Sequence, residues 1–201
     1  MELVDAVHRR RMVRRYAPDP VDPAVVDRLL ALAVRAPSAG FAQGWAFLVL
    51  DRPEDVDRFW NVTSPSPGAD SRWLRGMRTA PVVVVPMAGK QAYLDRYAEP
   101  DKGWTDRDES RWPAPYWQLD TAMASLLVLL GAVDEGLGGC FFGIPVDRLP
   151  AFGDAFGVPA SHRPIGAMTL GHPATDGGEA GRGSRGRGRR PMDQVVHRGR
   201  W

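Results

Sequence analysis

Hydrophobic and polar residues follow two different periods along this chain. Apolar residues spaced three or four apart predict helices, and short apolar runs rich in β-branched residues predict buried strands. The predicted helices span 2–15, 23–35, 117–135 and 146–156, with a short one beginning near Pro53. The predicted strands span 46–50, 82–85 and 165–170. This order predicts one α+β domain over residues 1–201, with helices around a central mixed β-sheet.

Two of these helices carry further signals. Asp22 is a suitable N-cap, and Pro23 would occupy the first helical position. The helix at 117–135 is apolar on all sides, so we expect it to be buried in the core or in a subunit interface. The longest apolar stretch, 121–133, is short for a membrane span of about 20 residues, and no membrane association is expected.

The composition is that of a soluble protein, with 44% hydrophobic and 25% charged residues. The single cysteine, Cys140, excludes an intramolecular disulfide and fits a reducing compartment, so we expect a cytoplasmic protein. The net charge of +2 hides an asymmetry. Residues 182–201, the basic arm, contain seven arginines and one acidic residue, whereas the rest of the chain is mildly acidic.

Residues 90–116 differ from the rest of the chain. Charged residues and prolines alternate there with aromatic residues, and no periodic pattern indicates a helix or a strand. Long segments of this kind are often functional, and we interpret this one as a substrate lid. Its candidate substrate-contacting residues are Tyr93, Tyr97, Trp104 and Trp112.

Three short motifs carry candidate chemistry. In RAPSAGFAQGW, residues 35–45, Pro37 ends a helix and the small residues after it let the backbone approach a flat ligand. RRRMVRRY, residues 9–16, supplies guanidinium groups suited to phosphate. GLGGCFFGIP, residues 136–145, lacks the spacing and the preceding strand of a dinucleotide-binding fingerprint. Each motif also has a structural interpretation, as a helix-to-strand turn, a solvated charged surface and core aromatic residues respectively.

Together with the basic arm, these motifs resemble those of the FMN-dependent nitroreductases, in the same order along the chain. The resemblance implies an intertwined homodimer with FMN sites between the subunits. It implies that Arg10 binds the FMN phosphate, with Arg11 as a further candidate. It places Arg14 by the flavin pyrimidine edge, where a fixed cation stabilises the negative charge of reduced flavin. Met12 stands where the family often has serine.

The resemblance also implies cofactor contacts from the other motifs. Residues implied to pack along the flavin from the neighbouring subunit are Pro37, Ser38, Ala39 and Gly40, with Gln43 close by. A backbone N–H near Gly143, beside Phe142, is implied to face flavin N5, so no catalytic side chain is required. In the basic arm, the residues implied to return to the FMN phosphate are Arg187, Arg189 and Arg190.

The implied activity is a ping-pong oxidoreduction. NAD(P)H gives hydride to the flavin and leaves, and an electron-poor acceptor takes the electrons at the same face. Nitroaromatic compounds, quinones and related planar molecules are the implied acceptors. Phe41 joins the aromatic residues of the lid as a candidate substrate contact.

Two alternatives stay open. Enzymes of the same fold fragment reduced flavin with oxygen or dehalogenate iodotyrosines, and the Gly40-Phe41 pair matches the flavin-fragmenting group. A nucleic-acid-binding protein using the Gly-Arg arm is the non-enzymatic alternative. The acidic body disfavours it, so we expect no nucleic-acid partner. No metal is expected either, because the histidines lack metal-ligand spacing with Cys140 or with carboxylates.

Overall fold

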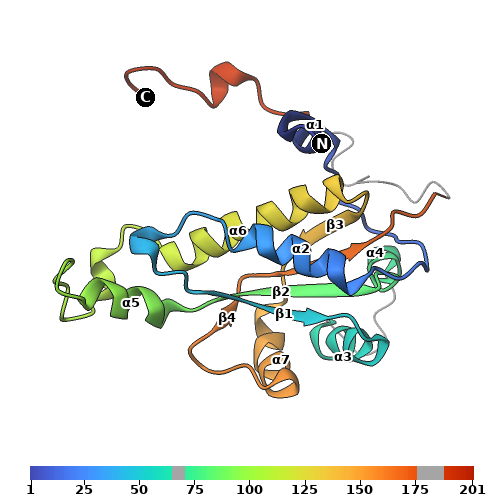
Figure 1. Cartoon of the computed structure of the whole chain (residues 1–201), viewed down its shortest axis with the longest axis horizontal. Helices are drawn as coiled ribbons and strands as arrows, with labels where there is room; N and C mark the ends of the chain where they lie inside the picture. Colours follow the sequence, from blue (N-terminus) through green and yellow to red (C-terminus); the bar gives the residue numbers. More distant parts are fainter. Residues whose placement is uncertain (65–70, 176–187) are drawn as a thin grey trace.

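The computed structural model describes residues 1–64, 71–175 and 188–201. Its centre is an antiparallel sheet in the order β1-β2-β5-β3, with β4 pairing to β2 (Figure 1). The strands are β1 (Trp45–Leu50), β2 (Val82–Ala88), β3 (Gly138–Phe142), β4 (Arg163–Pro164) and β5 (Ala167–Gly171). The predicted α+β class is confirmed. The sheet is mixed only through one parallel bridge in the described residues, between Met12 and Gly139.

Helices cover both faces of this sheet. In the described part of the chain they are α1 (Leu3–Arg9), α2 (Pro23–Ala33), α3 (Pro53–Thr63), α4 (Arg72–Met77), α5 (Lys90–Ala98), α6 (Tyr116–Asp134) and α7 (Leu149–Phe156). Figure 1 shows α2 and α6 on one face and α3 and α7 on the other. The predicted cap of α2 is confirmed, because an Asp22 carboxylate oxygen accepts a hydrogen bond from the Ala24 N–H at 2.9 Å.

Strand β2 divides the hydrophobic core into two clusters. All of its residues are buried, as the sequence predicts for 82–85. Val82 and Val84 pack with residues of α2 and α6, whereas Val83 and Val85 pack with residues of α3 and α7. Successive side chains of a strand point to opposite faces, so this one apolar run serves both layers.

The prediction of a first helix over 2–15 is wrong beyond Arg9. The helix ends there, and residues 10–16 form an extended segment alongside β3. The Val13 N–H donates to the Gly139 carbonyl at 3.0 Å, which replaces the hydrogen bond that a helix would have given it. Helical geometry would also stack the guanidinium groups three and four residues apart, where like charges repel.

Helix α6 confirms the helix predicted at 117–135. It is long and apolar enough to cross a membrane by length and composition, so length does not exclude a span. It packs against α2 and the sheet as a core helix. The predicted burial in the core is confirmed for one face of α6. Leu119, Met123 and Leu126 form an exposed apolar stripe on the single chain, and its burial in a subunit interface stays a prediction.

The segment 90–116 is more regular than the sequence indicates. It contains α5 and a short 3-10 helix, η2 (Glu109–Arg111). Charged pairs hold it together: Lys90–Glu109, Arg96–Asp101, Arg107–Asp95 and Arg111–Asp106. Tyr93 and Leu94 are the only buried residues of α5. Because the rest of the helix is polar or exposed, its sequence shows no clear apolar period.

Candidate functional site

The arginine motif is an extended segment with two different sides. Arg10, Met12 and Arg14 are partly buried and Tyr16 is fully buried, whereas Arg11 and Arg15 are exposed. Apart from Val13, which is also partly buried, this is the alternation of a strand. The fold therefore directs Arg10 and Arg14 to the same side.

Tyr16 fixes the backbone of this segment. Its hydroxyl donates to the Val13 carbonyl at 2.7 Å and lies 2.7 Å from the Thr169 hydroxyl. Its N–H donates to the Thr79 hydroxyl at 2.8 Å. Burial raises the pKa of Tyr16, so the hydroxyl stays neutral and keeps its donor proton. Arg14 is thus held on a rigid backbone.

The two inward arginines carry buried donors that the described protein does not satisfy. Arg10 Nη1 and Arg14 Nε are both buried and have no hydrogen-bond partner in the described residues. Both arginines act on the nearby Cys140 thiol. Burial raises the pKa of this thiol, and the positive charges of Arg14 and Arg10 oppose that rise. Buried charged donors require partners, so this arrangement suits an anionic ligand.

A pocket of about 310 Å³ lies beside the same segment. Its basic lining comes from Arg9, Arg11, Arg14 and Arg15. Its opposite wall is the end of α6 and the following turn, including Val133, Gly136 and Gly138. The pocket reaches Arg14 and the outward arginines of the segment, and Arg10 does not line it.

The end of β3 lies open beside an aromatic cluster. The Phe142 ring stacks on the Trp60 ring, with centroids 5.5 Å apart and 10° between the planes. Gly143 follows and is exposed, and a Cβ placed on it would meet no atom within 4 Å. The side of Gly143 on which a Cβ would stand therefore faces open space.

The second predicted group of cofactor contacts lies elsewhere in the chain. The loop 37–43 contains η1 (Ala39–Phe41) and sits on α5 near the start of α6, whereas α1 lies over the other end of α6 (Figure 1). Three of its residues have left-handed backbones, Gly40 (φ 60°), Phe41 (φ 57°) and Gln43 (φ 51°). A single copy of the chain does not bring this loop to the arginine segment.

A buried carboxylate that the sequence analysis missed anchors this loop. Asp120 of α6 is 2% exposed and accepts hydrogen bonds from the Ala39 N–H at 2.8 Å and the Tyr93 hydroxyl at 2.7 Å. Burial raises the pKa of Tyr93, so its hydroxyl stays a donor. The Ser38 hydroxyl accepts from the Gln43 N–H at 2.8 Å. The available signal was an acid within the apolar body of the helix, well before the acids at its end, Asp134 and Glu135.

The aromatic residues of the lid contact one another. Tyr93 is fully buried, and the Tyr97 ring lies 4.9 Å from Trp104 and 4.5 Å from Trp112 between centroids. Phe41 differs from them, because 75% of it is exposed. Their role as substrate contacts stays a prediction, and Phe41 is the aromatic residue of this group that a ligand reaches most easily.

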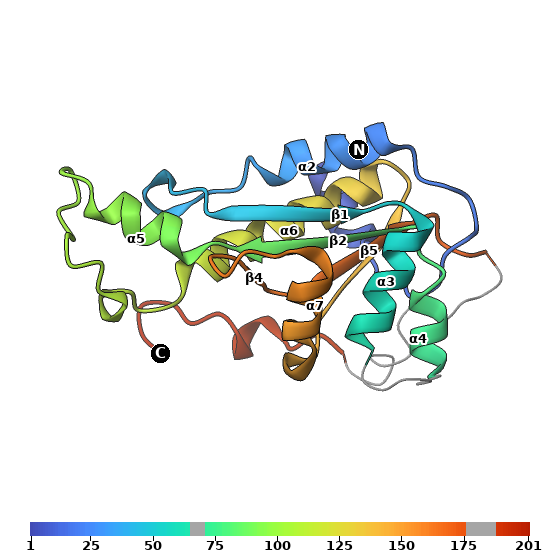
Figure 2. The same cartoon turned by 90° about the horizontal axis from the view of Figure 1, so that it is seen from below.

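The described part of the basic arm stands clear of the body (Figures 1 and 2). Arg189 and Arg190 are exposed, and Arg190 Nη2 donates to the Gln194 carbonyl within the arm at 2.7 Å. Arg187 lies outside the described residues. Within one chain, the described residues 188–201 of the arm do not fold back onto Arg10 and Arg14.

Most of the chain is similar to proteins of one family. The profile of the nitroreductase family matches residues 7–172. A protein named NADH dehydrogenase/NAD(P)H nitroreductase from Methanothermobacter thermautotrophicus is 26% identical over 180 residues, 89% of this chain and 81% of the relative. A 5,6-dimethylbenzimidazole synthase from Rhodobacter capsulatus is 45% identical over 51 residues, 25% of each chain.

A solved structure shows the same fold. It is that of a nitroreductase in complex with FMN from Desulfovibrio desulfuricans, with a TM-score of 0.71 at 21% identity. The likeness covers 98% of this chain and 95% of that one.

Proposed function

The chain belongs to the nitroreductase family of FMN-binding oxidoreductases, and we propose that it is a homodimeric, FMN-dependent NAD(P)H oxidoreductase. The observation that carries the proposal is the pair of buried, unpartnered donors on Arg10 and Arg14. They are the groups that an anionic cofactor with a phosphate and an electron-poor ring system would satisfy.

Each motif then has a distinct task. Arg10 binds the phosphate of FMN, and the outward Arg11 and the arm residues Arg189 and Arg190 add positive charge. Arg14 places a fixed cation against the polar edge of the ring, on a backbone that Tyr16 holds. The exposed backbone at Gly143 offers an N–H to the ring, beside Phe142. FMN, when bound, supplies the hydride-accepting and hydride-donating centre.

The second copy supplies the rest of the site. Loop 37–43 and the arginine segment lie far apart within one chain, so a shared site requires two chains. The exposed apolar residues of α1 and α6 fit such an interface: Leu3, Val4, Val7, Leu119, Met123 and Leu126. The arm also exposes Val195, Val196 and Trp201, which suits docking on a partner.

The proposed reaction uses donor and acceptor in turn. NAD(P)H binds first and leaves oxidised, and a nitroaromatic, a quinone or a related planar compound then occupies the same space. The protein contributes charge, backbone donors and exclusion of water, without a side chain acting as acid or base.

Removal of the inward arginines tests the cofactor assignment. A hydrogen bond to a charged group contributes about 1.5–3 kcal/mol, so we expect Arg10→Ala and Arg14→Ala each to raise the FMN Kd by about tenfold to a hundredfold. Fluorescence titration of the apoprotein with FMN measures this. Arg58→Ala is the control, because Arg58 contacts Asp55 and Phe156 on α3 and α7. A wild-type chain that takes up no FMN would end the proposal.

Flavin fragmentation is the second candidate function. It is favoured by the 45% identity over 51 residues to a 5,6-dimethylbenzimidazole synthase and by the Gly40-Phe41 pair in the loop. Aerobic incubation of the protein with reduced FMN, followed by mass spectrometry, distinguishes the two. Accumulation of 5,6-dimethylbenzimidazole supports fragmentation, whereas its absence together with reduction of quinones supports the reductase.

A further inference from the structure

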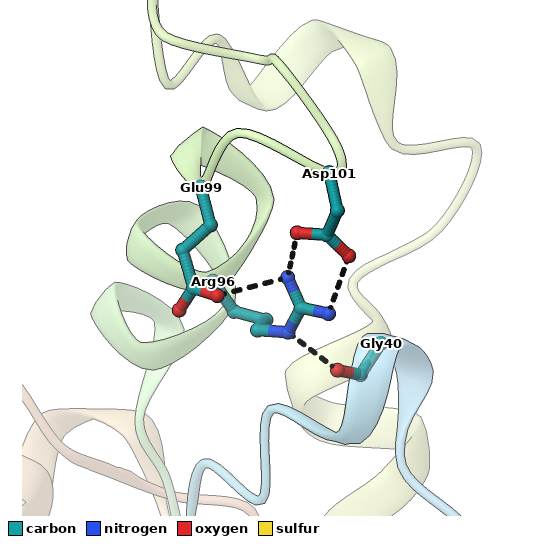
Figure 3. Close-up of polar contacts among 4 residues, drawn as sticks. All are labelled: Gly40, Arg96, Glu99 and Asp101. Atoms are coloured by element: carbon teal, nitrogen blue, oxygen red, sulfur yellow. Dashed lines mark hydrogen bonds and ion pairs between the residues drawn. The ribbon is translucent and has the colours of Figure 1, made fainter.

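Arg96 of α5 connects the lid to loop 37–43. Its Nε donates to the Gly40 carbonyl at 2.8 Å (Figure 3). Its two terminal nitrogens bind the two carboxylate oxygens of Asp101 at 2.7 and 2.8 Å, and one of them also reaches Glu99 at 3.1 Å. The bidentate pair fixes the plane of the guanidinium group, so the remaining N–H points at one place in the loop.

The loop is held from a second direction by Asp120. The neighbouring Ala39 N–H donates to this buried carboxylate at 2.8 Å. Consecutive residues of the loop are therefore bound to an anion from α6 and a cation from α5. Charge-assisted hydrogen bonds of this kind are stronger than neutral ones, and two on adjacent residues define the local backbone.

The clamped residues have a backbone that needs such support. Gly40 is left-handed, and a Cβ on it would lie 2.6 Å from the Tyr97 ring. Phe41 is also left-handed, which is unfavourable for a residue with a bulky side chain. Strained residues persist where the surrounding structure over-determines them. With this backbone conformation, the Phe41 ring points outward, and 75% of the residue is exposed.

We propose that Arg96 is a positioning residue for substrate: by holding the Gly40 carbonyl, it fixes Phe41 as the surface on which a planar aromatic acceptor stacks. The inference rests on the proposed oxidoreductase function. Phe41 suits the task because the lid aromatic residues are occupied by one another. An aromatic ring with few rotatable bonds offers a stacking face at little entropic cost.

The test compares two acceptors of the FMN-loaded protein. Menadione is planar and aromatic, whereas ferricyanide offers no ring to stack on. We expect Phe41→Ala to raise the KM for menadione about tenfold, the equivalent of about 1.4 kcal/mol, with the ferricyanide KM unchanged. Phe41→Tyr retains the ring and should restore the wild-type value. Arg96→Gln should raise the menadione KM in the same direction.

A double variant shows whether Arg96 acts through Phe41. If it does, Arg96→Gln adds nothing further in the Phe41→Ala background. Asp101→Asn keeps Arg96 but removes half of its bidentate anchor, and should give a smaller shift of the same sign. Arg107→Gln is the matched control, because Arg107 pairs with Asp95 within the lid without contacting the loop in the described structure.

The contradicting results are distinct. The inference is wrong if Arg96→Gln affects both acceptors equally, if the two substitutions multiply, or if Phe41→Ala leaves the menadione KM unchanged. Thermal melting and FMN content identify a variant that is merely unfolded. If Arg96→Gln is unfolded, the menadione KM of Asp101→Asn decides whether the inference holds. A wild-type protein inactive with both acceptors contradicts the proposed function itself, and the inference falls with it.

Discussion

At the scale of single residues, the candidate site depends on how firmly the arginine segment is held. Tyr16 is 3% exposed, and its hydroxyl joins Val13 to Thr169 of β5. The Arg14 side chain hydrogen-bonds the Cys140 thiol, whereas its Nε is buried without a partner in the described residues. Its position is therefore set by neighbours, and Tyr16 is the neighbour that a substitution tests most cleanly.

We expect Tyr16→Phe to lower stability and FMN affinity together. The ring still fills its place, but the Val13 carbonyl and the Thr169 hydroxyl lose a partner, which costs about 1–2 kcal/mol. Thermal melting and FMN titration measure the two effects. Tyr116→Phe, at the half-buried first residue of α6, serves as control. Unchanged FMN affinity in Tyr16→Phe would show that Arg14 is held in some other way.

The sequence resemblance points to Arg10, Arg14 and Gly143 as cofactor contacts, a role that stays a prediction. The structure adds that Arg10 and Arg14 carry buried donors without partners in the described residues. Asp120 and Arg96 were missed, because their importance lies in contacts with Ala39 and Gly40 that are distant in the sequence. A charged residue that binds a distant backbone group produces no periodic pattern in the sequence.

At the scale of elements, the predicted lid 90–116 combines a cluster of packed aromatic rings with a set of ion pairs at its surface. Its ion pairs are exposed, and Arg96 lowers the pKa of Asp101 while Arg111 lowers that of Asp106. A carboxylate whose pKa is lowered by folding stabilises the folded lid above its ordinary pKa of 3.8, and this stabilisation is lost as the pH falls through the lowered value.

We therefore expect the lid to open in acid before the core does. Hydrogen exchange, corrected for the intrinsic pH dependence, should accelerate in peptides from 90–116 as the pH drops below about 4. Peptides from β2 are the internal control, because this strand is fully buried and carries no ionisable side chain. Equal acceleration in both would contradict a separate lid transition. High salt at neutral pH should weaken the same pairs by screening.

Elements with a strong period were predicted well, and those defined by tertiary pairing were not. The β-branched run of β2 and the apolar run of α6 were both placed correctly. The prediction of helix for residues 10–16 is wrong, because the segment is extended through a bridge from Met12 to Gly139, which lies far away in the sequence. The local preference of a residue for helix or strand carries no information about a partner so distant in the sequence.

At the scale of the whole molecule, the proposed site is divided between two copies of the chain. The exposed stripe of α6, Leu119, Met123 and Leu126, is the surface that association would cover. A carboxylate buried in such an interface is strongly unfavourable. We expect Met123→Glu to give a monomer, by light scattering, that binds FMN poorly. Val146→Glu changes an exposed apolar residue of the turn before α7 and should remain a dimer.

The basic arm distinguishes flavin binding from nucleic-acid binding. If the arm completes the phosphate site, deletion of residues 182–190 releases FMN and leaves RNA binding unchanged. If the arm binds nucleic acid, the same deletion abolishes a strongly salt-dependent association and spares the flavin. FMN content after gel filtration and an RNA titration at two salt concentrations measure the two outcomes.

The central claim is that this chain is an FMN-dependent NAD(P)H oxidoreductase. Its most direct test is anaerobic titration of the FMN-loaded protein with NADH and with NADPH, followed by visible absorbance. We expect at least one donor to bleach the bound FMN stoichiometrically, and a quinone added afterwards to restore the colour. Bound FMN that neither donor reduces would contradict the claim.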